Sequence, residues 1–217
     1  MRIIVHMDIL TIASQKGGTG KSTLTAHLAV EAERRGAGPV AVVDTDPQGS
    51  LAAWWNQRAA ETPLFAAVEV VRLVEHMSAL QEEGVNLVLI DTPPAFMDTI
   101  RAPIGEADVV LIPARPSPHD LRAVGVIVEM AEAASKPFGF VVNGATPRTT
   151  IALQAVQALA QHGPVAPVIL HQRIDFAGSM VDGRTVGEVN PQSRSAQEIT
   201  DLWKYVNIQL RKYRRRT

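Results

Sequence analysis

Apolar residues in this chain gather in short continuous runs, and longer amphipathic stretches separate these runs. The runs are rich in valine, isoleucine and leucine, which is typical of strands buried on both faces. They predict strands at residues 9–13, 40–44, 68–71, 87–91, 109–113, 138–142 and 167–170. Helical spacing predicts helices at residues 22–35, 50–60, 74–83, 97–105, 119–134, 150–162 and 193–213. The alternation predicts an α/β fold, a mostly parallel twisted sheet with helices on both faces.

Size and composition agree with one domain of this kind. The chain has 217 residues, of which 46% are apolar, so residues 1–217 are expected to form a single domain with a sizeable core. The absence of cysteine excludes disulfides, thiolate zinc sites and cysteine-ligated iron–sulfur clusters. No apolar run has the length of a membrane span, and the N-terminus lacks a signal peptide, so we expect a cytoplasmic protein.

A glycine-rich segment lies between the first predicted strand and the first predicted helix. It reads Gln15-Lys16-Gly17-Gly18-Thr19-Gly20-Lys21-Ser22-Thr23. Strand, glycine loop and helix in this order form the context of a phosphate-binding loop. Glycines let backbone N–H groups turn toward an anion, and the helix adds the positive end of its dipole. We therefore expect residues 17–23 to bind the phosphates of ATP, with Lys21 at the β- and γ-phosphates and Ser22 on Mg²⁺.

The loop departs from the common pattern in two positions. Gln15 stands where that pattern has glycine, and Lys16 is an additional cation. This segment resembles the deviant Walker A motif, KGGxGK[ST], of the ParA/MinD family of P-loop ATPases. The resemblance implies an ATP-dependent homodimer in which Lys16 crosses the interface and contacts the phosphates bound by the other subunit. A transferring phosphoryl group needs positive charge beside it, so Lys16 and Lys21 are both candidate catalytic residues.

Carboxylates follow two of the predicted strands. Asp44 and Asp46 come at the end of strand 40–44, and Asp91 ends strand 87–91. Ligands of open α/β sheets bind at the carboxyl ends of the strands, and Mg²⁺ prefers oxygen ligands. The resemblance identifies Asp91 as the Walker B aspartate and residues 44–48 as switch I. It implies that Asp44 helps to organise the water shell of the metal, that Asp46 positions the attacking water, and that residues 92–94 form switch II.

The resemblance also implies two adenine contacts. Asn143 follows strand 138–142, where the family often has a polar residue that contacts the base. The segment 187–193 is similar to a late loop that wraps the base before the last helix, so Asn190 and Pro191 are candidates for the adenine pocket. Each of these residues could equally be an ordinary turn residue.

The C-terminus carries a concentration of positive charge. The formal net charge is −1, but residues 211–217 hold five cations, which leaves −6 on the rest of the chain. Three interpretations stay open: a solvated helix end, a surface for nonspecific DNA, or a membrane-surface helix. We favour DNA, because Arg194, Lys204, Arg211 and Arg214 need only phosphate contacts and a dimer would double each of them. We also expect Trp203, Val206 and Leu210 to pack on the sheet, which disfavours the membrane.

The resemblance extends over residues 9–211 and is greatest to the small, ParF-like ParA proteins. It implies a partition or positioning ATPase that associates with the nucleoid and acts with a ParB-like centromere-binding protein or a cargo adaptor. No N-terminal helix-turn-helix is expected, so sequence-specific DNA recognition is not predicted. The alternatives are a MinD-like membrane-associated ATPase and a metabolic P-loop enzyme related to dethiobiotin synthetase. Plasmid, chromosome and protein assembly all stay open as the cargo.

Overall fold

The computed structural model describes residues 6–94 and 97–215, which form one parallel sheet covered by helices. Seven strands pair in the order β3-β2-β4-β1-β5-β6-β7, and every pairing is parallel. The strands are β1 (Asp8–Ile12), β2 (Val40–Asp44), β3 (Leu64–Ala67), β4 (Leu87–Asp91), β5 (Val109–Ala114), β6 (Phe138–Ala145) and β7 (Val165–His171). The α/β fold class predicted from the sequence is therefore confirmed.

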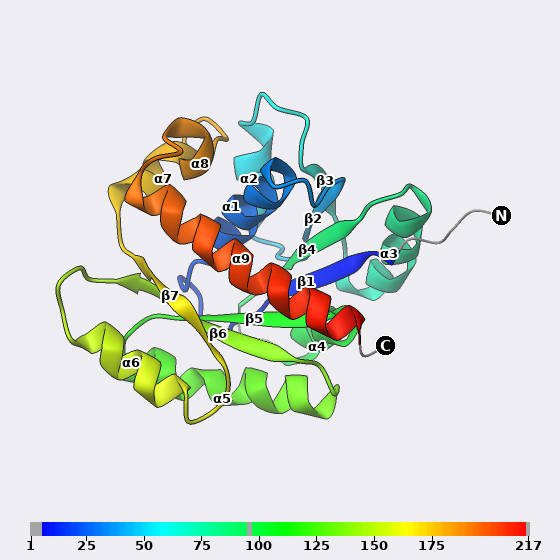
Figure 1. The fold of residues 1–217 in the computed structure, drawn as a ribbon. Coiled ribbons are helices and arrows are strands. Elements are labelled where there is room, and N and C mark those ends of the chain that lie inside the picture. The colour runs from blue at the N-terminus through cyan, green and yellow to red at the C-terminus, as the bar shows by residue number, and fades with distance from the viewer. Residues whose placement is uncertain (1–5, 95–96, 216–217) are drawn as a thin grey trace.

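Helices cover both faces of the sheet (Figure 1). They are α1 (Lys21–Arg34), α2 (Ser50–Asn56), η1 (Val70–Arg72), α3 (Leu73–Glu82), α4 (Met97–Glu106), α5 (Pro118–Ala133), α6 (Ile151–Leu159), α7 (Ile174–Met180), α8 (Val186–Val189) and α9 (Arg194–Arg214). One core cluster joins α1, α2, α8 and α9 to the sheet, with α7 packed against it. Two further clusters lie on the opposite face, beneath α3, α4, α5 and α6.

The register of the central strands brings the predicted site residues to one edge. Ile12 at the end of β1 is opposite Asp91 at the end of β4, and Asp91 is opposite Asp44 at the end of β2. Because all strands run in the same direction, these carboxyl ends and the loops that follow them share one edge of the sheet. The phosphate loop follows β1, so it lies beside both aspartates.

One strand prediction was wrong. The strand of this region is β3, which ends before residue 68, and the second half of the stretch 68–71 belongs to the short helix η1. The backbone N–H of Val68 donates to the carbonyl of Asp44, where β2 ends, so the following residues lie beyond the sheet. Val71 is consequently 89% exposed. The β-branched composition favoured a strand there, but the partner strand had already ended.

Other boundaries differ less. Helix α2 ends at Asn56 rather than at residue 60, and the short helices α7 and α8 were not predicted. The last helix, predicted at residues 193–213, is found at Arg194–Arg214. Across the described residues, none of the helices combines the length and apolar character that a membrane crossing requires.

Candidate nucleotide-binding site

The phosphate loop lies between β1 and α1 and leaves the first turn of α1 open. Gly20 precedes α1 with a φ of 92°, in the left-handed region that favours glycine, and no side chain caps the helix. The first turn of α1 also contains no acidic residue. Unsatisfied N–H groups and the helix dipole therefore face the loop, which is the arrangement that binds anions.

Lys21 places its ammonium group inside this loop. Its side chain is buried, and Nζ lies 3.4 Å from the carbonyl oxygen of Lys16, to which it donates a hydrogen bond. Burial lowers the pKa of Lys21 below its ordinary value, while the carboxylates of Asp91 and Asp46 oppose that shift. A bound phosphate group would supply the counter-charge that this buried cation needs.

Asp91 is the most deeply buried carboxylate of the site. Its side chain is fully buried, and neither carboxylate oxygen has a hydrogen-bond partner of normal geometry among the described residues. Burial raises its pKa to about 7 against the opposing effects of the nearby Ser22 hydroxyl and the Lys21 ammonium, and Asp44 adds to the rise. An unpaired buried carboxylate beside a serine hydroxyl fits the donor set of Mg²⁺, so Ser22 and Asp91 are the residues that would hold it.

Both carboxylate oxygens of Asp44 accept hydrogen bonds from the protein backbone. One of its carboxylate oxygens accepts from the backbone N–H of Asp46 and the other from that of Ala52, at 3.0 Å each. Burial raises the pKa of Asp44, and these N–H groups oppose the rise. In this structure Asp44 therefore fixes the turn that follows β2 and the first turn of α2. Its role at the metal stays a prediction.

Asp46 lies at the mouth of the site. It is half-buried, and one carboxylate oxygen accepts from the backbone N–H of Gln48. It borders an open groove of about 770 Å³ between the switch I residues 44–48 and the switch II residues Pro93 and Pro94. The structure thus brings Asp44, Asp46 and Asp91 together beside the phosphate loop, as the sequence predicted.

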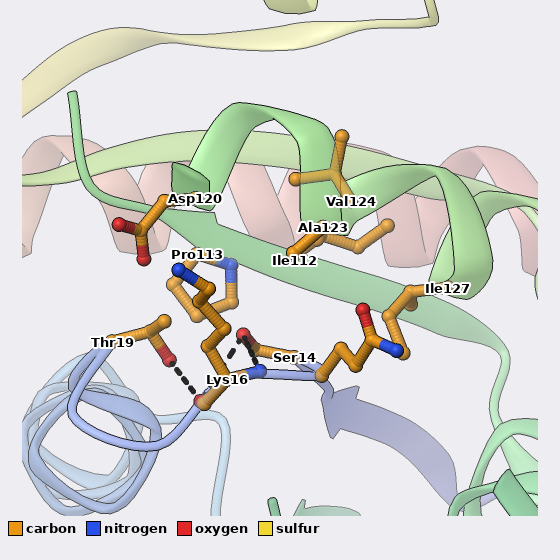
Figure 2. Close-up of a pocket in the computed structure, with 10 residues that line it drawn as sticks. Ser14, Lys16, Thr19, Ile112, Pro113, Asp120, Ala123, Val124 and Ile127 are labelled. Carbon is orange, nitrogen blue, oxygen red and sulfur yellow. Dashed lines mark hydrogen bonds between the residues drawn. The ribbon is translucent and has the colours of Figure 1, made fainter. Parts of the chain in front are cut away.

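Lys16 extends away from the loop on which it stands. Figure 2 shows its side chain directed over Pro113 toward Asp120 in the first turn of α5. It forms no ion pair with any residue in the described part of the chain, and it is half-buried. The backbone N–H of Lys16 donates to the Ser14 hydroxyl, and its carbonyl accepts from the Thr19 hydroxyl, which holds the loop, whereas no ion pair fixes the ammonium group among the described residues.

Asn143 braces the phosphate loop, a contact that the sequence did not reveal. Its Nδ2 donates to the carbonyl of Thr19 at 2.6 Å. A Cβ at Gly20 would lie 2.4 Å from that nitrogen, so only glycine fits there. The contact places Asn143 beside the loop, while its role at the base stays a prediction. Asn190 and Pro191 are exposed in the turn before α9, and the structure shows no hydrogen bond from either of them to the phosphate loop.

The predicted DNA contacts do not form one patch on the subunit. Helix α9 has 21 residues, so its ends are separated by about 30 Å. Arg194 begins the helix near the carboxyl end of β7, whereas Arg211 lies near its other end, beside the start of β1. Lys204 is paired with Asp201, and Arg214 forms an ion pair with Asp8.

The fold and the loop define a P-loop nucleotide-binding protein. The model of the CobQ/CobB/MinD/ParA nucleotide binding domain matches residues 10–186 of the chain, so the protein belongs to this family. The chain is thus a member of the ParA/MinD group of P-loop proteins, as the loop motif indicated.

Named relatives are partition and positioning proteins. The chain is 30% identical to maintenance of carboxysome distribution protein A of Halothiobacillus neapolitanus, over 87% of this chain and 91% of the relative. It is 26% identical to the chromosome-partitioning ATPase Soj of Thermus thermophilus, over 86% and 90% of the two chains. Among solved structures, MinD of Pyrococcus horikoshii with Mg-ADP covers 93% of this chain and 96% of its own, with a TM-score of 0.78 at 18% identity. That last similarity concerns the fold alone.

Proposed function

We propose that the chain is a ParA-like partition or positioning ATPase that dimerises with Mg-ATP, binds DNA without sequence preference and hydrolyses ATP when a partner protein engages it. The observation that carries the nucleotide site is the pair formed by the buried Lys21 ammonium inside the loop and the unpaired Asp91 carboxylate next to it. Phosphates would satisfy the cation, and Mg²⁺, which neutralises charge on the β- and γ-phosphates, would satisfy the carboxylate. Family membership and the names of the relatives support the partition or positioning role.

Dimerisation is assigned to Lys16. Its ammonium group lacks an ion-pair partner among the described residues, and its side chain is directed away from the phosphate loop on which it stands (Figure 2). A cation supplied from the partner subunit would stabilise the charge that develops on the transferring phosphoryl group. The site of a single subunit is then incomplete, so we expect hydrolysis to be slow until a partner protein acts.

Asp46 is the proposed positioning group for the attacking water. Its carboxylate is partly exposed at the mouth of the site, and it contributes to the electrostatic environment of Lys21. We expect Asp46→Ala to give a dimer that persists with ATP and stays bound to DNA, because hydrolysis is needed for the subunits to separate. Light scattering after gel filtration and a DNA-binding assay, each with ATP and with ADP, measure this. Normal ATP hydrolysis by the variant would show that the role is misassigned.

The role of Lys16 is tested by the same light-scattering measurement of the oligomeric state. Lys16→Ala should abolish ATP-dependent dimerisation while the monomer still binds nucleotide through the rest of the loop. The exposed Lys212 provides a matched control, since Lys212→Ala removes the same charge far from the site. A Lys16 variant that dimerises as the unaltered protein does would refute the contribution in trans.

The membrane-associated alternative is tested by comparing binding to duplex DNA with binding to anionic liposomes. Trp203, Val206 and Leu210 of α9 are buried in the core, which leaves little apolar surface on this helix for a bilayer. We expect the ATP-bound protein to co-sediment with plain duplex DNA and not with anionic liposomes. The reverse result would favour the MinD-like alternative. Hydrolysis that responds to neither surface but requires a small second substrate would favour a metabolic enzyme.

A further inference from the structure

A buried arginine ties the end of α2 to a distant part of the chain. The side chain of Arg58 is 4% exposed. It donates to both carboxylate oxygens of Glu188, at 2.7 and 3.0 Å, and to the carbonyl oxygens of Gly183 and Thr62, each at 2.7 Å. Bidentate, charge-assisted bonds of this kind fix orientation as well as distance.

Glu188, the partner of Arg58, is held in place by hydrogen bonds of its own. Glu188 closes the capping box of α8 with Thr185, accepting from both the backbone N–H and the hydroxyl of Thr185. A Cβ at Gly183 would lie 2.4 Å from the backbone of Arg58, so the two segments pack as closely as glycine allows. Trp54 adds a hydrogen bond from its indole N–H to the carbonyl of Arg184, and the Arg58 guanidinium lies 5.3 Å from the centre of the Trp54 ring.

Helix α2 connects the Arg58–Glu188 ion pair to the nucleotide site. It is only seven residues long and follows the switch I residues 44–48 directly. Its first-turn N–H at Ala52 is bonded to the carboxylate of Asp44, whose other oxygen holds the N–H of Asp46. A shift of α2 would therefore displace both aspartates.

We propose that Arg58, through Glu188, is a positioning residue for ATP hydrolysis: the ion pair of the buried Arg58 with the half-buried Glu188 holds α2 against α8 and so keeps Asp44 and Asp46 in place. This inference rests on the proposed function of the site. A geometric error of about 1 Å in a catalytic group can reduce a rate by two orders of magnitude, so a contact far from the phosphates can control turnover. No hydrogen bond joins Arg58 to the phosphate loop, and Arg58 lies outside the segment 187–193 that is predicted to wrap the base, so nucleotide affinity should depend little on Arg58.

The test separates binding from the chemical step. Single-turnover hydrolysis with excess protein gives the rate, and titration with a fluorescent ATP analogue gives the affinity. We expect Arg58→Lys to slow hydrolysis about tenfold while the affinity changes by less than about twofold, and Glu188→Gln to slow hydrolysis by a similar factor. Both variants keep the size of the side chain and remove the bidentate ion pair. Gly183→Ala, which separates the same segments without altering a charge, should have the same effect.

A double-mutant cycle and a control complete the experiment. Arg58→Lys and Glu188→Gln combined should slow hydrolysis no more than either alone, because they remove one interaction. Hydrogen exchange at the amides of Asp46 and Ala52 should speed up in the variants, a local change that a general loss of stability would not confine to α2. Arg184→Ala is the matched control, because the side chain of this neighbouring arginine, within the described residues, pairs only with the exposed Asp182.

Three results overturn the inference: an unchanged single-turnover rate, an equal loss in rate and in affinity, or exchange that rises throughout the molecule. Failure of the proposed function looks different. In that case the unaltered protein neither binds the ATP analogue nor hydrolyses ATP, and no comparison among variants arises.

Discussion

At the scale of single residues, the site contains a buried carboxylate, Asp91, that is a proposed metal ligand and that lowers the stability of the folded protein when it is ionised. Asp91 is fully buried without a hydrogen-bond partner in the described structure, and burial raises its pKa to about 7. A carboxyl whose pKa is higher in the folded state destabilises that state as pH rises through the range between the two values. Ionised Asp91 therefore makes the folded protein less stable above pH 7, because the nearby Lys21 ammonium offsets the cost of burying this charge only in part.

Asp91→Asn should stabilise the nucleotide-free protein and impair its response to magnesium. We expect the free energy of unfolding in urea at pH 8 to rise by about 1–3 kcal/mol, since a neutral amide replaces a buried charge. The additional thermal stabilisation by ATP with Mg²⁺, over ATP with a chelator, should disappear. Asp182→Asn, at an exposed ion pair, should leave the free energy of unfolding unchanged within experimental error. A less stable Asp91 variant would contradict the assignment.

His27 makes a second pH-dependent contribution to the stability of the fold, with the opposite sign to that of Asp91. It is fully buried in α1 between the carbonyl of Thr23 and the hydroxyl of Ser179, and burial lowers its pKa to about 4. Between pH 6.5 and pH 4 the His27 imidazole binds a proton in the unfolded chain but not in the folded state. The free energy of unfolding therefore falls as the pH falls. Asp91 opposes this trend over the same range, and only a comparison of variants isolates His27.

His27→Asn should remove that acid sensitivity. Urea unfolding at pH 7 and pH 4.5 should show the unaltered protein losing up to about 3 kcal/mol relative to the variant. The contribution of Asp91 is common to both proteins and cancels in the difference. Parallel pH profiles for the two proteins would show that His27 is protonated in the folded state.

At the scale of elements, the sequence predicted best where local pattern and tertiary role agree. The central strands are apolar on both faces and lie inside the sheet, so their runs identified them closely. The phosphate loop and the strand-end aspartates were predictable because their positions follow from the order strand, loop, helix. The edge strand β3 was misplaced, since its position depends on how far β2 extends. The Arg58–Glu188 contact could not be foreseen, because it joins residues 130 positions apart.

The apolar face of helix α9 is expected to contribute strongly to the free energy of unfolding. Its apolar stripe is buried against the sheet and α1, and Trp203 is 3% exposed within it. Trp203→Ala should lower the free energy of unfolding by about 3–5 kcal/mol through lost burial and a cavity. Ile208→Ala, at a half-exposed position on the same helix, should cost less than about 1 kcal/mol. Equal effects measured by urea unfolding would mean that the helix does not pack as described.

At the scale of the whole molecule, the separation of the basic residues constrains how DNA can bind. Arg194 and Arg211 lie at opposite ends of α9, and Arg214 is neutralised by Asp8. In the described part of the chain, the basic residues of the last turn of α9 are therefore far from Arg194, and the whole chain has a net charge of −1. We infer that affinity depends on contacts from two subunits, which makes binding sensitive to dimerisation and to salt.

This argument predicts a measurable salt dependence. Removing one phosphate contact from each subunit of a dimer should reduce the slope of log K against log salt by about 2, since each contact contributes about 0.9. Arg211→Ala should have this effect on duplex DNA of any sequence, measured with the Asp46→Ala protein held in its ATP-bound dimer. Arg122→Ala, an exposed arginine of α5, removes the same charge from another surface and should leave the slope unchanged. If both variants reduce the slope equally, DNA responds to net charge and α9 is not its binding surface.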